Sequence, residues 1–341
     1  METLLFILVG VLGIVAIVQA VRVFEISAQV KGGDESKVSD KDNRTQGLLL
    51  LLFLFFFLGA FAWMVYSWDS VILPKAASLH GADIDTLWAL SMGVIIVAFL
   101  VTQPLLFGFS FLFRGSKKRR AVYMEHNNKL ELFWTGVPAV VLAGLILYGL
   151  TTWSDTMNPS PEDEPLVVEV YGYQFNWKAR YSGTDNKLGY ANVRLIEGVN
   201  QLGLDVNDVS SLDDKVTNVL HLPVDRPVML KFRAQDVIHS AYMPHFRVQM
   251  NAVPGTETQF QFEPTMTTTE MRQDPEVIEK VKNINELRSA QGKDPYEFDY
   301  MLLCNKICGS AHYNMNMKVV VQTQEQFDKW LQEQKSFAET L

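Results

Sequence analysis

Residues 47–68 read GLLLLLFLFFFLGAFAWMVYSW, and this stretch decides the class of fold. No polar residue occurs between Leu48 and Phe57. A helix needs about 20 predominantly apolar residues to cross a bilayer, so the stretch predicts a transmembrane helix. Three further stretches are long and apolar enough for the same reading: Leu4–Val21, Leu87–Phe113 and Leu132–Trp153. The chain of 341 residues is therefore predicted to span a membrane four times.

The first apolar stretch has an alternative reading as a cleaved signal peptide. Such a peptide has a basic start and a small-residue cleavage site. This chain begins Met-Glu-Thr, and Arg22 follows the apolar run instead of preceding it. These features favour a retained span.

Lysine and arginine gather in two of the loops between the spans. Residues 22–46 contain five and residues 114–129 contain six, whereas the loop between the second and third spans contains only Lys75. Short cytoplasmic loops carry the excess of positive charge, so both basic loops are predicted to lie inside. Both termini and the long carboxyl-terminal part then lie outside. The expected lack of a cleavable leader suggests a bacterial inner membrane, with these parts on its periplasmic side.

Charge divides the chain into two parts. Residues 1–153 contain 12 Lys/Arg and 11 Asp/Glu, a net charge of +1, whereas residues 154–341 contain 18 and 27, a net charge of −9. The excess negative charge of the outer part has two possible roles: it steers a basic partner toward this domain, or it only keeps the domain soluble. Neither a phosphate loop nor a basic nucleic-acid patch is present, and no CxxCH motif indicates an attached haem.

The outer part reads as a β-rich domain behind an acidic, turn-rich linker at residues 158–165. Short runs rich in Val, Phe and Tyr are bounded by Pro, Gly, Asp and Asn, as is typical of strands. The predicted strands are Leu166–Trp177, Asn218–Leu222, Val228–Ala234, Phe246–Val253, Thr258–Phe262, Phe298–Leu303 and Lys318–Gln322. Short strands without regularly interleaved helices indicate a sandwich or barrel.

Two helices are predicted within this domain. Asp274-Pro275-Glu276 is a typical helix start, and an apolar stripe follows it at Val277, Ile278, Val281, Ile284 and Leu287. Thr323 and Gln326 fit a capping box before a second helix.

A metal-binding pattern lies between the last two predicted strands. Cys304-Asn-Lys-Ile-Cys308-Gly-Ser-Ala-His312-Tyr-Asn-Met315 brings two thiols, an imidazole and a thioether into one short segment. Sulfur ligands combined with imidazole select copper, zinc or iron–sulfur centres. A thioether favours copper, and two thiols are too few for the usual iron–sulfur cluster. A disulfide and a zinc site that uses His239 or His245 remain alternatives.

Four ordered motifs resemble cytochrome c oxidase subunit II, over about residues 87–335. The segment C-x3-C-x3-H-x2-M resembles the ligand loop of that family's binuclear copper domain, and Asp236-Val-Ile-His239-Ser240, followed by Pro254-Gly255, resembles its upstream histidine segment. Residues 126–139 resemble the opening of its second span, and residues 172–177 its aromatic segment.

The resemblance implies four membrane spans in α-helical hairpins and an all-β, cupredoxin-like Greek-key sandwich that binds two copper ions. The implied ligands are His239, Cys304, the backbone carbonyl of Lys306, Cys308, His312 and Met315. It divides the chain into an additional hairpin at 1–70, the family hairpin at 71–157 and the copper domain at 158–341, with a helical insert at about 274–290. The first two spans and the whole insert from Pro264 to Asp299, which contains this helix, have no counterpart in the common two-span pattern.

The same resemblance draws attention to three places in the chain, at two of which the sequence departs from the usual family residue. Lys306 stands where the family usually has a glutamate that helps to bind an interface magnesium ion, so that ion is predicted to be missing or held differently. The usual tryptophan at which electrons enter is Phe175 here. Either Phe175 or nearby Trp177 serves in that role, or the entry route differs and both residues are core aromatics. Glu131, at the inner edge of the fourth span, is expected to be a solvated flank or the mouth of a proton channel.

The implied function is to accept electrons from a cytochrome c, or a cytochrome c domain, and to pass them to haem in subunit I. Oxygen is reduced there and protons are pumped. The implied partners are subunit I, other oxidase subunits, membrane lipid and possible donor complexes, but no nucleic acid. A membrane-anchored protein that stores or delivers copper is the alternative. A quinol-oxidase subunit without copper is disfavoured by the intact ligand set, and a nitrous-oxide reductase by the presence of only six histidines.

Overall fold

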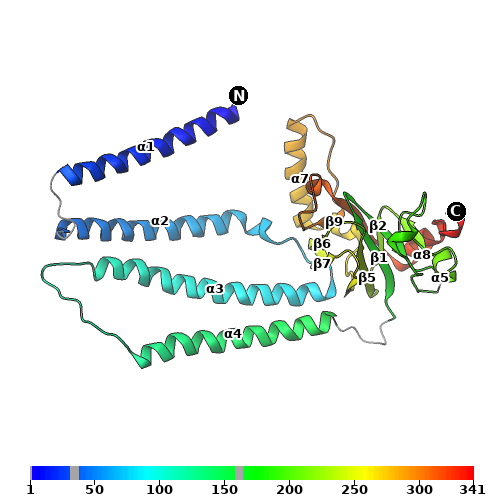
Figure 1. Cartoon of the computed structure of the whole chain (residues 1–341), viewed down its shortest axis with the longest axis horizontal. Helices are drawn as coiled ribbons and strands as arrows, with labels where there is room; N and C mark the ends of the chain where they lie inside the picture. Colours follow the sequence, from blue (N-terminus) through cyan, green and yellow to red (C-terminus); the bar gives the residue numbers. More distant parts are fainter. Residues whose placement is uncertain (1, 31–37, 158–163, 184) are drawn as a thin grey trace. The chain divides into compact units, whose positions relative to one another are not determined.

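The computed structural model describes residues 2–30, 38–157, 164–183 and 185–341 (Figure 1). It contains four helices that are long and apolar enough to cross a membrane. They are α1 (Glu2–Val30), α2 (Asp40–Ile72), α3 (Leu79–Leu112) and α4 (Asn128–Met157). Each predicted span lies within one of them except for Phe113, the last residue of the third. The four-span prediction is therefore confirmed.

The chain forms two compact units. The first comprises Met1–Ser67 and Ile96–Asn127. Within it α2 packs against the second half of α3 through phenylalanine rings. The Phe57 and Phe99 rings lie 5.6 Å apart edge to face, and the Phe61 and Phe99 rings lie 5.0 Å apart. The second unit comprises Trp68–Ile95 and Asn128–Leu341, and it contains the outer domain.

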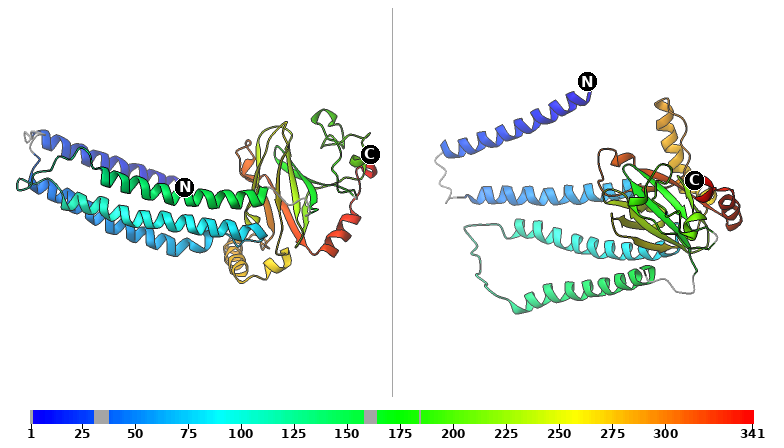
Figure 2. Two further views of the ribbon diagram at one scale, coloured as in Figure 1. Left: turned by 90° about the horizontal axis from the view of Figure 1, so that it is seen from below. Right: turned by 45° about the vertical axis from the view of Figure 1, so that its right-hand side comes forward.

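The outer domain is a sandwich of two five-stranded sheets (Figures 1 and 2). One sheet has the order β3-β2-β1-β5-β8 and the other the order β4-β10-β9-β6-β7. The first contains β1 (Leu166–Tyr173), β2 (Asn176–Tyr181), β3 (Lys215–Thr217), β5 (Val228–Ala234) and β8 (Thr258–Phe262). The second contains β4 (Leu220–Pro223), β6 (His239–Met243), β7 (Val248–Ala252), β9 (Tyr300–Cys304) and β10 (Asn316–Gln322).

Parallel pairs interrupt the otherwise antiparallel sheets. β1 lies parallel to β5, and β4 lies parallel to β10. Alternating residues of each strand point into one apolar core, as the alternating burial along β5 shows. Chain-distant strands are thus neighbours in both sheets, which confirms the predicted Greek-key sandwich.

The predicted helices begin where the capping signals place them. The Asp274 side chain accepts a hydrogen bond from the Glu276 N–H at the start of α7 (Pro275–Ala290). Thr323 and Gln326 form the capping box of α8 (Gln324–Glu333). The apolar stripe of α7 is only partly correct, because Ile278 and Leu287 are 53% and 68% exposed. The structure adds short helices that the sequence analysis did not predict: α5 (Val209–Leu212), α6 (Thr268–Arg272) and four 3-10 turns.

Two predicted strands are wrong in detail. Leu166–Trp177 is not one strand, because the chain turns at Gln174 and Phe175 and returns as β2. Phe246–Val253 starts too early, since residues 244–246 form a 3-10 turn and β7 begins at Val248. Strands β3 and β6 and most of β2 were not predicted.

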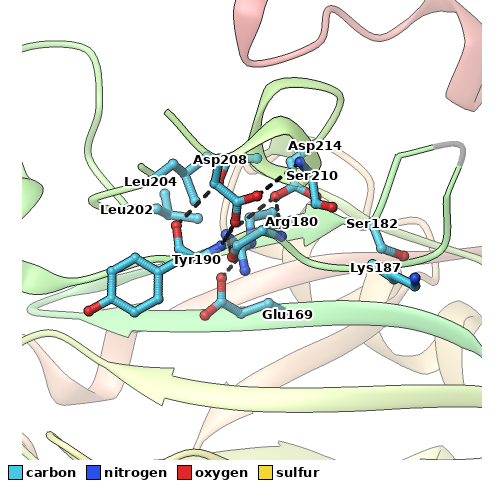
Figure 3. Close-up of polar contacts among 12 residues, drawn as sticks. Glu169, Arg180, Ser182, Lys187, Tyr190, Leu202, Leu204, Asp208, Ser210 and Asp214 are labelled. Atoms are coloured by element: carbon cyan, nitrogen blue, oxygen red, sulfur yellow. Dashed lines mark hydrogen bonds and ion pairs between the residues drawn. The ribbon is translucent and has the colours of Figure 1, made fainter. Parts of the chain in front are cut away.

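The long connection between β2 and β3 covers the outer face of the first sheet. Consequently both faces of β1 are buried, and Tyr171 on its outer face packs against Leu202 and Leu204. Charged groups are buried beneath the same connection (Figure 3). Arg180 Nε lies 2.8 Å from Glu169 Oε2, and Arg180 Nη1 lies 3.4 Å from Asp214 Oδ2.

The segment before α3 is joined to the sandwich by backbone hydrogen bonds. The Ala77 N–H donates to the His245 carbonyl, and the Leu79 N–H donates to the Glu263 carbonyl. Arg247, in the left-handed region at φ 54°, donates to both carboxylate oxygens of Asp85 at 2.7 and 3.0 Å. It lies between β6 and β7, so the hairpin that begins at His239 is tied to the start of α3.

Replacing Arg247 by methionine is expected to lower the free energy of unfolding of the outer domain by about 2–4 kcal/mol, because several charge-assisted hydrogen bonds are lost at once. Asp85→Asn retains an oxygen acceptor and should cost about half as much. Thermal melting of the full chain in detergent, followed by near-ultraviolet circular dichroism, measures both effects. Equal melting of Arg247→Met and the unaltered chain would show that this contact does not contribute.

Candidate metal centre

The predicted ligands come together at one end of the second sheet. His239 is the first residue of β6, Cys304 is the last residue of β9, and Met315 directly precedes β10. The Cys304 N–H donates to the Met315 carbonyl, and the Asn305 N–H donates to the Ser240 carbonyl. These bonds close the 304–315 loop over the end of three neighbouring strands.

The donor atoms fall into two matching sets. Cys304 Sγ lies 3.9 Å from His239 Nδ1 and 3.2 Å from the Lys306 carbonyl oxygen. Cys308 Sγ lies 3.7 Å from His312 Nδ1 and 3.7 Å from Met315 Sδ. The two sulfur atoms, 3.8 Å apart, join the sets. Each thiol therefore has one imidazole and one weaker donor beside it.

This donor set fits a pair of copper ions. Two sulfurs bound at about 2.3 Å to a shared metal must lie within about 4.6 Å of each other, as these do. Thiolate, imidazole and thioether are ligands that copper accepts. His239 is fully buried, and Cys308 and Met315 are 5% and 2% exposed, so these three donors are shielded from water, whereas Cys304 and His312 are half-buried.

The thiols must lose protons before they bind a metal. Burial and the neighbouring Cys304 thiol raise the pKa of Cys308 to about 11. Without a metal the thiol is thus protonated at neutral pH, and metal binding is coupled to proton release.

The alternatives to a copper site were a disulfide and a zinc site that uses His239 or His245. His245 does not reach the thiols, since its Nδ1 lies 3.0 Å from the Lys75 carbonyl oxygen and its ring packs against Phe298 and Tyr300. A zinc site that includes His245 is therefore wrong. The structure holds Cys304 and Cys308 as free thiols.

Asp236 orients one of the candidate ligands. Its Oδ1 lies 2.9 Å from His239 Nε2, which leaves His239 Nδ1 to face Cys304. Backbone N–H groups of Gln174 and Val237 donate to the same carboxylate, each at 2.7 Å. Burial tends to raise the pKa of Asp236, but these bonds and the one from His239 hold it below its usual value.

Gln174 links this carboxylate to the second thiol. Its backbone N–H binds Asp236, and its side-chain amide donates to the carbonyl of Cys308. Neither Asp236 nor Gln174 was assigned a role from the sequence. A carboxylate three residues before a candidate histidine ligand was the available signal.

Asp236→Ala is expected to weaken copper binding by about 10–100-fold, because the His239 ring loses the acceptor that fixes its orientation. Asp236→Asn, whose oxygen can still accept from Nε2, should have a smaller effect. Competition with a copper chelator measures the affinities, with the distant Glu257→Ala as a matched control. Unchanged affinity in Asp236→Ala would contradict this role.

The two aromatic candidates differ in exposure. Trp177 is completely buried, and its ring centroid lies 5.7 Å from that of His239. Phe175 is half-buried and packs on the ligand loop: a Cβ atom at Gly309 would lie 2.7 Å from its ring. Gly309 also has φ 142°, so glycine is required there by both backbone and contact.

Lys306 and Glu131 are the two remaining positions that the sequence singled out. The Lys306 side chain is exposed, although its carbonyl faces Cys304. Glu131 is half-buried in the first turn of α4.

Comparisons with known proteins agree with this organisation. Residues 166–280 match the family model described as cytochrome c oxidase subunit II, periplasmic domain, and residues 66–152 match that of its transmembrane domain. An alternative cytochrome c oxidase subunit 2 from Bradyrhizobium diazoefficiens is 34% identical over 248 residues, which cover 71% of this chain and 78% of the relative.

One more distant relative and one solved structure are also similar to this chain. The cytochrome c oxidase subunit 2 of Thermostichus vulcanus is 24% identical, with 78% of this chain and 80% of the relative covered. A crystal structure of the periplasmic domain of subunit II of cytochrome oxidase from Bradyrhizobium japonicum aligns with 19% identity and a TM-score of 0.31, over 52% of this chain and 95% of that one.

Proposed function

Because this chain belongs to the cytochrome c oxidase subunit II family, we propose that its outer domain holds a binuclear copper centre that receives electrons from a cytochrome c and passes them toward haem in subunit I. The family places the chain in a haem-copper oxidase, an oxidoreductase complex. Oxygen reduction and proton pumping take place in the partner subunit.

The observation that carries the proposal is the paired donor arrangement. His239, Cys304 and the Lys306 carbonyl would hold one copper ion, and Cys308, His312 and Met315 the other, with both thiolates shared. Such a pair takes up and releases one electron at a time. His239 and Cys304 lie on strands, and backbone hydrogen bonds hold the loop with the other donors against these strands, which limits rearrangement when the charge changes.

Phe175 is the better supported position at which electrons enter. It is partly exposed and contacts the ligand loop at Gly309, whereas Trp177 is closed off from solvent. Trp177 instead supports the His239 ring from within the core.

Lys306 is expected to change metal binding at the interface with subunit I. An ammonium group cannot bind a divalent cation, so a magnesium ion is expected to be missing or held differently there. Metal analysis of the assembled oxidase, with a structure of it, tests this. A fully occupied metal bound close to residue 306 would contradict the proposal.

The orientation follows from the basic loops. Both termini and the copper domain would face the periplasm, in a bacterial inner membrane, and the hairpins would divide at about residues 70 and 157. Glu131 would then lie at the inner face, where it could serve the mouth of a proton channel in subunit I. The additional spans and the insert leave room for contacts with a donor complex.

Copper quantitation and electron paramagnetic resonance on the purified full chain test the function. We expect two copper ions per chain with a mixed-valence signal, and copurification with a haem-containing subunit on coexpression. One labile copper ion without a haem partner would instead support copper storage or delivery. Zinc, or a disulfide in place of metal, would overturn both readings.

A further inference from the structure

The loop between α3 and α4 carries a concentrated positive charge. Lys117, Lys118, Arg119 and Arg120 follow one another directly, and all four are exposed. In the part of the chain that the structure describes, no carboxylate forms an ion pair with any of them. Adjacent like charges repel one another, so an external anion would stabilise this arrangement.

The backbone around these cations is held in a turn. The Arg119 N–H donates to the Ser116 carbonyl, and its guanidinium donates to the Leu112 carbonyl at the end of α3. The Lys117 N–H donates to the carboxylate of Asp40 at the start of α2. The cationic turn is thus fixed against the ends of two spans.

An apolar segment directly follows the four cations. Val122, Tyr123 and Met124 are 90%, 86% and 61% exposed. A basic loop alone is explained by its role in setting the orientation of the spans, but that role does not require exposed apolar and aromatic side chains beside it. Tyrosine is typical of the boundary between headgroups and acyl chains.

From this combination we infer that residues 117–124 form a binding surface for anionic phospholipid. The four cations contact headgroup phosphates, and Val122–Met124 insert at the boundary with the acyl chains. Electrostatic attraction and apolar burial together give more durable membrane contact than either one alone. The surface is separate from the copper ligands and does not depend on them.

Native mass spectrometry of the full chain, released from nanodiscs of equal phosphatidylcholine and phosphatidylglycerol, tests the inference. We expect the unaltered chain to retain phosphatidylglycerol preferentially. Changing all four cations to glutamine should reduce that preference by about tenfold or more. The matched control changes Lys280, Lys282, Lys293 and Lys329, which are exposed in the outer domain, and should have no effect.

Two further variants separate the effect of charge on lipid retention from poor membrane insertion and from the effect of the apolar segment. A charge-preserving exchange (Lys117→Arg, Lys118→Arg, Arg119→Lys, Arg120→Lys) should retain lipid binding even if the glutamine variant inserts poorly. Replacing Val122, Tyr123 and Met124 by serine should weaken retention while the charge is unchanged.

Other outcomes would overturn the inference. Equal retention of both lipids by the unaltered chain would do so. Full competition by inorganic phosphate would indicate a site for the free ion. Loss of association with subunit I in the glutamine variant, with lipid retention unchanged, would indicate a protein contact. Copper content, measured on the same samples, separates these outcomes from a failure of the proposed function.

Discussion

Cys308→Ser is expected to abolish the mixed-valence copper signal and to leave less than one tightly bound copper ion per chain. Cys308 Sγ is the central donor of the site, since it lies within 3.8 Å of the Cys304 and Met315 sulfurs and of His312 Nδ1. A serine hydroxyl is a harder and much less acidic ligand than a thiol, so it cannot replace a thiolate shared by two soft ions.

Copper analysis and electron paramagnetic resonance on the full chain measure this effect. Ser310→Ala, an exposed change in the same loop, is the matched control and should keep both ions. Near-ultraviolet circular dichroism shows whether the sandwich remains folded. A folded Cys308→Ser chain that retains two copper ions and the mixed-valence signal would refute the ligand assignment.

Much of this site could be predicted because its ligands are close in sequence. Four side-chain donors lie in the segment from Cys304 to Met315, and their residue types restrict the choice of metal. His239 is distant in the chain and was placed by the family resemblance. Spacing cannot show that β6 and β9 are neighbours, whereas the pairing of Ala241 with Cys304 brings them together in the structure.

The misplaced strands have a local explanation. Residues 166–177 consist largely of strand-forming residues, and the turn at Gln174 and Phe175 contains neither glycine nor proline. Strand propensity therefore concealed the hairpin. Asp236 was equally difficult to assign, because its position beside His239 depends on how the chain enters β6 and on amide groups of Gln174 and Val237.

The buried ion cluster was not predicted either, since sequence does not show which charges lose contact with water. Glu169 lies on β1, Arg180 on β2 and Arg233 on β5, whereas Asp214 is the last residue of the long connection between β2 and β3. Arg233 Nε lies 2.6 Å from Glu169 Oε1. Two carboxylates and two guanidinium groups thus balance one another in formal charge beneath that connection.

Arg180→Met is expected to destabilise the outer domain by about 3–5 kcal/mol, the usual cost of removing one partner from a buried ion pair. The Arg180 side chain is 4% exposed, and those of Glu169 and Asp214 are 2% and 0% exposed. Burial already raises the pKa of Asp214 to about 7, although Arg180 acts to lower it. Without Arg180 this carboxyl loses its only ion-pair partner among the described residues.

Urea unfolding of the full chain in detergent measures the loss. Lys231→Met breaks a solvent-accessible pair between Lys231 on β5 and Glu257, which directly precedes β8, and should cost no more than about 1 kcal/mol. In Arg180→Met/Asp214→Asn the second carboxylate is removed, so part of the lost stability should return. A loss in Arg180→Met no larger than that in Lys231→Met would mean that the cluster is hydrated, and that apolar contacts of Tyr171 with Leu202 and Leu204 hold the connection in place.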